Sequence, residues 1–319
     1  MKKIGVLTGG GDAPGMNAAI RAIVRMAIYF DWEVIGIEEG FSGLISKKFR
    51  RLDSSVVSGI IHQGGTILRS VRCPEFKQMR NLKKVIKNIR EEKIDGLIVI
   101  GGNGSLKGAH SIQKQGIPVN FIPASIDNDV FGTEDTIGFD TAVNTALDAI
   151  DKIRDTATSH ERIFLIEVMG RKSGFLALEV GLAAGAEAIL IPEVKFKIEA
   201  LCNILRKGIK RGKKSYIIVV AEGAGKTSEI GKEIGKRIKG EIRVTTLGYL
   251  QRGGSPSADS RNLASRLGAL AVKLLKDKKK GKMLGIIRGE IASIPIEEVY
   301  LRRKRIDLQT YRLAKILGL

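Results

Sequence analysis

The sequence predicts an α/β protein in which helices cover both faces of mostly parallel sheets. Short runs of β-branched and other apolar residues recur along the chain, and a glycine-rich or polar turn and then an amphipathic stretch follow each run. Leu97–Ile100 and Ile217–Val220 are uninterrupted apolar runs, as expected for strands buried on both faces of a parallel sheet. A guide of about 150 residues per domain predicts two domains for the 319 residues.

The expected strands form two series along the chain. The first comprises Ile4–Leu7, Val34–Ile37, Leu97–Ile100 and Val119–Ile122, and the second comprises Phe164–Val168, Ala188–Ile191, Ile217–Val220 and Arg243–Thr246. Helical patterns fill the intervals. In Met16–Phe30 the apolar residues Ile20, Ile23, Val24 and Ala27 form one stripe, while Arg21 and Arg25 share a different face. We expect a boundary between the series near Gly138–Thr141.

Composition excludes several classes of protein. A chain that is 43% hydrophobic and 28% charged is typical of a folded globular protein rather than a fibre or linker. No apolar run approaches the ~18 residues of a membrane helix, and the apolar run after the first lysines is too short for a signal peptide, so we expect a cytoplasmic protein with no membrane partner. Two cysteines and three histidines fit neither a disulfide framework nor zinc spacing.

The charge balance favours anionic partners. The chain carries 54 basic and 34 acidic residues, a net charge of +20, which would attract nucleic acid or small phosphorylated ligands. Aromatic residues make up only 5% of the chain, and no basic segment interleaves them for stacking on bases. We therefore expect no nucleic-acid partner, although a nucleic-acid-binding protein remains a rival interpretation on charge alone.

Two glycine-rich turns follow expected strands and precede helices. The first is Gly9-Gly10-Gly11-Asp12, and the second is Gly101-Gly102-Asn103-Gly104-Ser105. Such turns present bare backbone N–H groups at a helix N-terminus, where an anion is favoured. The alternative is a tight strand-to-helix turn without a ligand. The first turn has neither the ending of a Walker A loop nor the spacing of a dinucleotide-binding fingerprint.

Acidic and basic side chains also cluster at expected strand ends. In Ser125-Ile126-Asp127-Asn128-Asp129 one carboxylate could hold Mg²⁺ and the other accept a proton, or the carboxylates could simply cap a turn. Arginine suits phosphate oxygens and the charge of a phosphoryl transition state, although each arginine could equally be a surface residue. Those near expected strand ends are Arg72, Arg162, Arg171, Arg243 and Arg252.

Five ordered motifs together resemble the bacterial ATP-dependent 6-phosphofructokinase family along essentially the whole chain. They are Gly10–Asn17, Pro74–Phe76, Ser125–Asp129, Glu167–Arg171 and Gln251–Pro256. The resemblance implies two Rossmann-like lobes, with a larger ATP-binding lobe of residues 1–139 plus about 251–305 and a smaller sugar-phosphate lobe of 140–250 plus about 306–319. It implies a homotetramer that phosphorylates fructose 6-phosphate to fructose 1,6-bisphosphate in glycolysis.

The resemblance also assigns roles to residues. Asp127 would be the general base of a direct in-line transfer, with Gly11, Arg72, Arg171 and Ser125 at the reacting phosphate and Asp129 and Asn103 at Mg²⁺. Fructose 6-phosphate would contact Ser125, Asp127, Arg162, Met169, Glu222, Arg243, Tyr249 and Arg252, of which Arg162 and Arg243 would come from a neighbouring subunit. ATP would lie against Gly11, Phe41, Arg72, Cys73, Asn103, Gly104, Ser105 and Gly108.

The sequence departs from the family pattern at several of these positions. Asn103 replaces an aspartate that serves Mg²⁺, which suggests weaker metal binding and, as an alternative function, a catalytically weak ligand-binding paralogue. Tyr249 replaces a histidine and Phe41 a tyrosine. Gly104 and Ala124 stand where pyrophosphate-using relatives carry aspartate and lysine, so ATP is the expected donor.

An effector site is a further implication of the resemblance. The matching residues would bind ADP or phosphoenolpyruvate as an allosteric effector, and they are Arg21, Arg25, Arg154, Gly185, Glu187, Arg211 and Lys213. Ser54 stands where an arginine is usual, so one anchor of that site is missing. The alternative is that these charges are ordinary surface residues.

Overall fold

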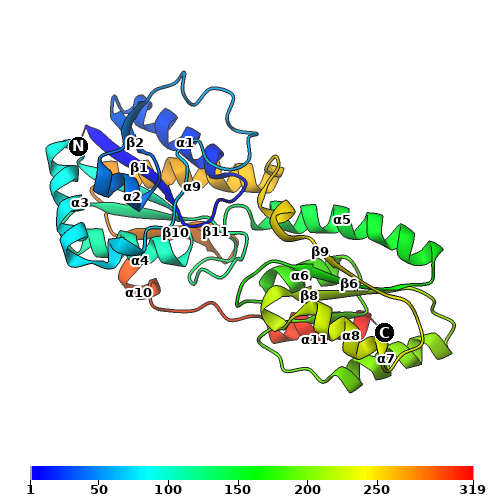
Figure 1. The fold of residues 1–319 in the computed structure, drawn as a ribbon. Helices are drawn as coiled ribbons and strands as arrows, with labels where there is room; N and C mark the ends of the chain where they lie inside the picture. The colour runs from blue at the N-terminus through cyan, green and yellow to red at the C-terminus, as the bar shows by residue number, and fades with distance from the viewer. Residues whose placement is uncertain (1, 319) are drawn as a thin grey trace. The chain divides into compact units, whose positions relative to one another are not determined.

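The computed structural model describes residues 2–318, and contacts divide the chain into two units (Figure 1). Unit 1 comprises residues 2–141 and Arg252–Lys304. Unit 2 comprises Ala142–Gln251 and residues 305–318. Each unit therefore contains a long first segment and a later segment that returns to it.

Unit 1 is built on a seven-stranded sheet in the order β11-β10-β5-β4-β1-β2-β3. Its strands are β1 (Lys3–Gly9), β2 (Glu33–Ile37), β3 (Phe49–Leu52), β4 (Gly96–Gly101), β5 (Val119–Pro123), β10 (Lys282–Ile287) and β11 (Glu290–Pro295). Strands β2, β1, β4, β5 and β10 are parallel, while β3 and β11 run antiparallel to their neighbours. The four strands expected for this part of the chain are confirmed, and β3, β10 and β11 are additions to the expected set.

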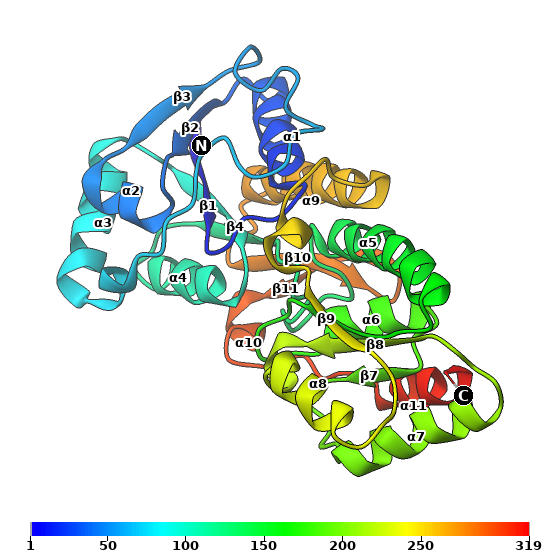
Figure 2. The same cartoon turned by 45° about the vertical axis from the view of Figure 1, so that its right-hand side comes forward.

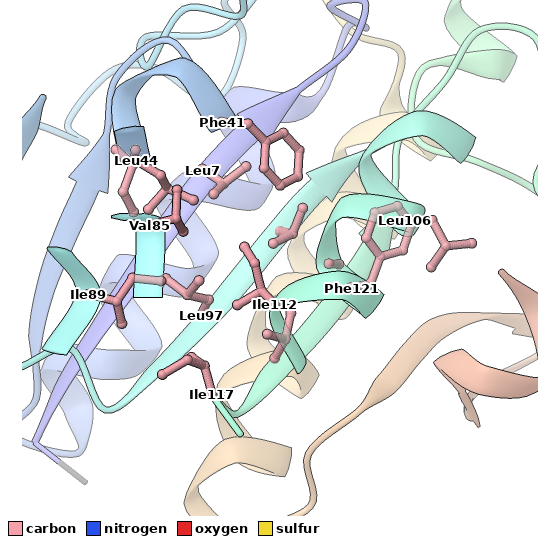
Figure 3. Packing of buried hydrophobic residues seen from close by; sticks show 14 of the residues in the cluster. Leu7, Phe41, Leu44, Val85, Ile89, Leu97, Leu106, Ile112, Ile117 and Phe121 are labelled. Atoms are coloured by element: carbon pink, nitrogen blue, oxygen red, sulfur yellow. The ribbon is translucent and has the colours of Figure 1, made fainter. Parts of the chain in front are cut away.

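Helices cover both faces of this sheet because its central strands are apolar on both faces. Every residue of β4 is buried. The helices of the unit are α1 (Met16–Tyr29), α2 (Phe41–Ser46), α3 (Met79–Glu91), α4 (Asn103–Gln113), α9 (Ala258–Lys276) and α10 (Ile296–Val299), with a 3₁₀ turn η1 (Pro74–Lys77). The apolar residues of α2, α3 and α4 pack on one face of β1, β4 and β5 (Figure 3). Helix α1 packs along α9, where a Cβ on Gly268 would lie 2.8 Å from the Ala19 carbonyl oxygen.

Unit 2 is built on a four-stranded parallel sheet in the order β7-β8-β6-β9. Its strands are β6 (Ile163–Val168), β7 (Ala188–Leu190), β8 (Tyr216–Ala221) and β9 (Ile242–Thr246). Its helices are α6 (Phe175–Ala183), α7 (Ile198–Lys210), α8 (Thr227–Gly235) and α11 (Leu308–Leu317), with 3₁₀ turns η2 (Glu222–Ala224) and η3 (Gly248–Arg252), and α5 (Phe139–Ser159) begins in unit 1.

Helices α7 and α8 pack against β6 and β8 in unit 2 (Figure 2). Leu201, Cys202 and Leu205 of α7 meet Ile230 and Ile234 of α8 in the core beneath that sheet. Helix α11 packs on α6 and β7, and the Asp307 carboxylate caps its first turn by accepting from the Gln309 N–H. Between residues 2 and 318, no helix is long and apolar enough to span a bilayer.

Candidate functional site

Three loops leave the sheet of unit 1 at the same edge. Gly9, the last residue of β1, pairs in register with Gly101, the last residue of β4, and Gly101 pairs with Pro123, the last residue of β5. Because these strands are parallel neighbours, the loops that follow them begin at one level. The structure therefore brings together the two glycine turns and the Ser125–Asp129 loop, at the strand ends where open α/β sheets bind ligands.

The first loop borders a cavity of about 350 Å³. The cavity is lined by Gly10, Gly11, Asp12, Thr66, Ser70, Arg72 and Arg252. Gly10 has a φ of 84°, a left-handed conformation that favours glycine. The Ser70 hydroxyl donates to the Gly10 carbonyl and so ties the loop to the segment that carries Arg72. Two expected phosphate ligands, Gly11 and Arg72, thus face the same space.

Arg252 in this cavity is paired with a carboxylate that the sequence analysis did not select. Its Nη2 lies 2.6 Å from Asp12 Oδ1. The pairing neutralises part of the positive charge that the cavity would otherwise offer to a phosphate. Asp12 lies next to the glycines in the Gly10–Asn17 motif, so the sequence could have identified it as a residue of this cavity. Nothing in the sequence marked Thr66 or Ser70 as lining residues.

The second loop packs against an aromatic side chain. A Cβ on Gly9 would lie 2.6 Å from Ser105 Oγ, and a Cβ on Gly108 would lie 2.4 Å from the Phe41 ring. The Phe41 and Phe76 rings are 4.5 Å apart between centroids. The structure therefore groups the expected nucleotide residues Phe41, Ser105 and Gly108.

Cys73 packs against the same core cluster as Phe41. Burial raises the pKa of the Cys73 thiol above its ordinary value, which keeps it protonated and disfavours nucleophilic chemistry. Gly104, in contrast, has open space around it, because a Cβ there would meet no atom within 4 Å.

The third loop holds Asp127 in a tightly bonded turn. Asp127 is only 7% exposed, and its backbone N–H donates to Ser125 Oγ at 3.2 Å. The next residue, Asn128, has a φ of 48°. The Thr136 hydroxyl donates to the Ser125 carbonyl, and the Ser125 N–H donates to the Ile137 carbonyl at 3.0 Å. The loop is thus fixed from both of its sides.

Asn103 and Asp129 are the candidate magnesium ligands, and the structure places them together. The Asn103 Nδ2 donates to the Asp129 backbone carbonyl at 3.2 Å. Within residues 2–318, no three His, Cys, Asp or Glu side chains cluster closely enough to hold a metal by themselves. Mg²⁺ commonly binds one or two protein oxygens and completes its shell with water and substrate phosphates. An amide and a carboxylate in neighbouring loops at the carboxyl ends of β4 and β5 fit that mode.

Charged residues also lie next to this third loop, among them Glu134, Asp135 and Lys304. Loss of water around Asp135 raises the pKa of its carboxyl, and Lys304 and Asn128 oppose that rise. Burial lowers the pKa of Lys304 to about 8, and the carboxylates of Asp135, Asp129 and Glu134 oppose that fall. Lys304 is far away in sequence, and no motif marked it.

Unit 2 gathers another set of expected residues at the carboxyl ends of its strands. Val168 of β6 pairs with Ala221 of β8, so Met169–Arg171 and Glu222 leave the sheet side by side. The Arg171 N–H donates to the Glu222 carboxylate, and the Met169 N–H donates to Gln251 Oε1 at 3.3 Å. Tyr249 follows β9 and is 78% exposed. Met169, Arg171, Glu222 and Tyr249 therefore belong to one edge of this sheet.

Arg162 and Arg243 lie at the opposite end of that sheet. Arg162 immediately precedes β6, and Arg243 pairs with Phe164 near the start of the strand. Both guanidinium groups bond to the carboxylate of Glu241, a partner that sequence analysis did not identify. The length of β6, at about 3.3 Å per residue, separates them from Met169. Unit 2 therefore does not bring all of its expected sugar-phosphate residues together.

Most of the expected effector residues also meet in unit 2. Lys213 Nζ lies 2.6 Å from Glu187 Oε1, and the buried Glu187 carboxylate also accepts from the Ile217 N–H at 2.6 Å. Arg154 donates to the Ala184 carbonyl, next to Gly185. Arg211 is the exposed C-cap residue that follows α7. Arg21 and Arg25 lie one turn apart on α1 in unit 1.

The chain is similar to known proteins along its whole length. A family model described as "Phosphofructokinase" matches residues 3–275. The ATP-dependent 6-phosphofructokinase of Bacillus cytotoxicus is 54% identical over 319 residues, which is all of both chains. The protein of the same name from Bacillus subtilis is 53% identical over the same length, again covering both chains completely.

A solved phosphofructokinase structure has the same fold as this chain. Pichia pastoris phosphofructokinase in the T-state matches with a TM-score of 0.90 and 32% identity. The match covers 99% of this chain and 36% of the Pichia chain, so this chain spans about a third of that larger protein.

Proposed function

Because this chain belongs to the phosphofructokinase family, we propose that it transfers the γ-phosphoryl group of ATP to the 1-hydroxyl of fructose 6-phosphate. One observation supports this reaction above the others. Three neighbouring parallel strands end in register, at Gly9, Gly101 and Pro123. The loops that follow them therefore bring the buried Asp127 to the same end of the sheet as the two glycine turns. That edge offers a base for the sugar and a cradle for the phosphates.

Asp127 is our candidate for the general base. The hydroxyl oxygen of the sugar forms a bond to the γ-phosphorus, the bond from that phosphorus to the β-phosphate oxygen breaks, and the hydroxyl proton passes to the Asp127 carboxylate. ADP leaves, and no covalent enzyme intermediate forms. The bond from the Asp127 N–H to Ser125 Oγ supports a fixed position for the base.

Stabilisation of the moving phosphoryl group falls to backbone and guanidinium donors. We assign the Gly11 N–H and Arg72, both on the lining of the cavity, to this role. We assign Arg171 the same charge-neutralising role. A phosphoryl transition state carries spread negative charge, so fixed positive groups lower its free energy more than that of the ground state.

Magnesium would be held by Asp129 and Asn103 together with the phosphates of ATP. When bound, Mg²⁺ neutralises charge on the phosphate oxygens. The Asn103 side chain brings one amide oxygen to this place, and its bond to the Asp129 carbonyl supports a shared position at the edge of the sheet.

ATP is the phosphoryl donor in this proposal, and the adenosine side lies against Phe41, Cys73, Gly104, Ser105 and Gly108. The close packing of Phe41 on Gly108 supports this grouping. Open space at Gly104, together with Ala124 rather than lysine, leaves room for an adenosine that a pyrophosphate-specific enzyme would exclude.

Fructose 6-phosphate is assigned to Met169, Glu222, Tyr249 and Arg252, and to Arg162 and Arg243 of a neighbouring subunit. The separation of the last two from Met169, by the length of β6, supports this division between subunits of a homotetramer. We further propose that ADP or phosphoenolpyruvate binds the cluster around Arg154, Glu187 and Lys213. The enzyme works in the cytoplasm in this proposal, where its two free cysteines stay reduced.

A coupled assay with fructose 6-phosphate, ATP and Mg²⁺ tests the reaction, and Asp127→Asn tests the base. We expect kcat to fall by about 10²- to 10⁴-fold, since proton transfer by a positioned side chain contributes that much. Asp53→Asn, at an exposed turn of the same unit, is the control and should keep full activity. Full activity in Asp127→Asn, with the variant folded by circular dichroism, would refute the assigned base.

A further inference from the structure

Lys304 reaches the outer side of the Asp127 loop from the far end of unit 1. It is the last residue of that unit in sequence. Its side chain is half-buried, whereas Arg303 and Arg305 on either side of it are exposed. The Lys304 Nζ donates to the backbone carbonyl of Glu134. A single lysine in an otherwise exposed basic segment thus turns toward the loop.

The Glu134 carbonyl connects Lys304 to the residue between the two candidate catalytic carboxylates. Asn128 Nδ2 donates to the same carbonyl at 3.1 Å and to Asp135 Oδ1 at 3.3 Å. Asn128 Oδ1 in turn accepts from the Thr136 hydroxyl at 3.3 Å. These bonds fix Asn128 in a left-handed backbone conformation, which asparagine adopts more readily than most residues other than glycine.

Charge complementarity adds to the hydrogen bonds. The carboxylates of Asp135, Asp129 and Glu134 each raise the pKa of Lys304, because a nearby negative charge stabilises the charged ammonium. Removal of the ammonium would leave three carboxylates near one another at the loop that carries the candidate magnesium ligand Asp129. Like charges at such a place repel, and the loop is the part of the structure that would move.

We propose that Lys304 is a positioning residue for phosphoryl transfer: by bonding to the Glu134 carbonyl that Asn128 shares, it holds Asp127 and Asp129 in place. The inference rests on the proposed function, because Asp127 must be the base for its position to matter. Lys304 touches no reacting atom in this account and acts only through the loop.

The test compares Lys304→Met with Arg303→Met. Both variants remove one positive charge, but only the first removes the bond to Glu134. We expect kcat of Lys304→Met to fall by about 10- to 100-fold, the cost of a displacement of about 1 Å at a reacting group, while KM for ATP changes by less than about twofold. Arg303→Met should match the wild type. Lys304→Arg, which keeps a donor and the charge, should recover part of the lost kcat.

Hydrogen exchange measured by mass spectrometry supplies a readout that does not depend on activity. We expect faster exchange in residues 125–137 of Lys304→Met, and unchanged exchange in α3 and α4. If Lys304→Met keeps wild-type kcat, or if exchange rises throughout unit 1 together with a lowered Tm, the positioning role is wrong. An inactive wild type would instead refute the proposed function and the inference with it, whatever the exchange pattern.

A double-mutant cycle checks the route through Asn128. Asn128→Gly tolerates the left-handed backbone but removes the amide. If both side chains act through the Glu134 carbonyl, the double variant with Lys304→Met should lose much less than the product of the two single losses in kcat. Multiplicative losses would overturn that route.

Discussion

Asn103 is the candidate magnesium ligand that departs from the family pattern. It begins α4, and its amide donates to the Asp129 backbone carbonyl. The donated bond orders the two candidate ligands without any metal, whereas an aspartate at position 103 would place a carboxylate against that carbonyl oxygen. We therefore expect the amide to bind Mg²⁺ more weakly than a carboxylate would, and to order this part of the loop when no metal is bound.

Asn103→Asp makes this exchange measurable. We expect the Tm without Mg²⁺ to fall, because the donor is lost and a negative charge is added near Asp129. We expect the Mg²⁺ concentration for half-maximal activity to fall by about tenfold, or about 1.4 kcal/mol, because a carboxylate binds the cation more strongly than an amide does. Thermal melts with and without Mg²⁺, and rates at varied Mg²⁺, give both values.

The control for that experiment is Asn203→Asp, the same change at an exposed position of α7 in unit 2. It should alter neither the Mg²⁺ dependence nor the effect of Mg²⁺ on Tm. If Asn103→Asp shows an unchanged Mg²⁺ requirement and an unchanged kcat, Asn103 is no handicap to the enzyme.

At the scale of elements, the sequence predicted eight of the strands and missed β3, β10 and β11. The eight expected strands are present, although Ala188–Ile191 ends one residue earlier, as β7, and the helix expected over Met16–Phe30 ends at Tyr29. Strand β3 contains Arg50 and Arg51, and β11 contains no buried residue, because both are edge strands with an exposed face. Apolar runs cannot reveal such strands. The Arg288–Gly289 turn between β10 and β11 was the missed signal for that hairpin.

The packing of α4 on the segment after α10 creates a pH-sensitive contact. The His110 ring stacks on the Tyr300 ring with centroids 3.7 Å apart, and within the described residues the buried His110 Nε2 has no hydrogen-bond partner. Burial lowers the pKa of His110 below its ordinary 6.5, and Lys114 lowers it further. As the pH falls through 6.5, the unfolded chain takes up a proton before the folded one does, so this contact loses stability on the acid side.

His110→Phe should remove that acid sensitivity. We expect the free energy of unfolding of the wild type to decrease between pH 7.5 and pH 5.5, and the decrease to be smaller in the variant. Urea titrations at the two pH values measure the difference at a fixed protein concentration. His62→Gln, at an exposed histidine, should behave as the wild type does. A variant with the same pH dependence as the wild type would exclude His110 as the source.

At the scale of the whole molecule, the returning segments show what periodicity cannot supply. Helix α9 and strands β10 and β11 follow unit 2 in the chain but complete the sheet and helices of unit 1. No period or composition shift marks that return, because contacts far apart in sequence decide it; only resemblance to a family indicated it. For the same reason the motifs located Asp127 and Gly11, whereas Glu241, the ion-pair partner of Arg162, and Lys304 emerged only from the fold. The ligand that each unit binds stays a prediction.

The placement of Arg162 and Arg243 leads to a prediction about assembly. If Arg162 and Arg243 come from a neighbouring subunit, each site is built from two chains. Asp127→Asn then alters one chain of a site, and Arg162→Ala alters the other. Hybrid tetramers made by unfolding and refolding an equal mixture should recover about a quarter of wild-type activity, because a quarter of the sites pair an intact Asp127 with an intact neighbouring Arg162. A mixture of Asp127→Asn and Arg171→Ala is the control. Both of those residues should come from the same chain, so no site in that mixture is intact and no activity should return. An inactive first mixture, or equal recovery in both, would contradict a site shared between subunits.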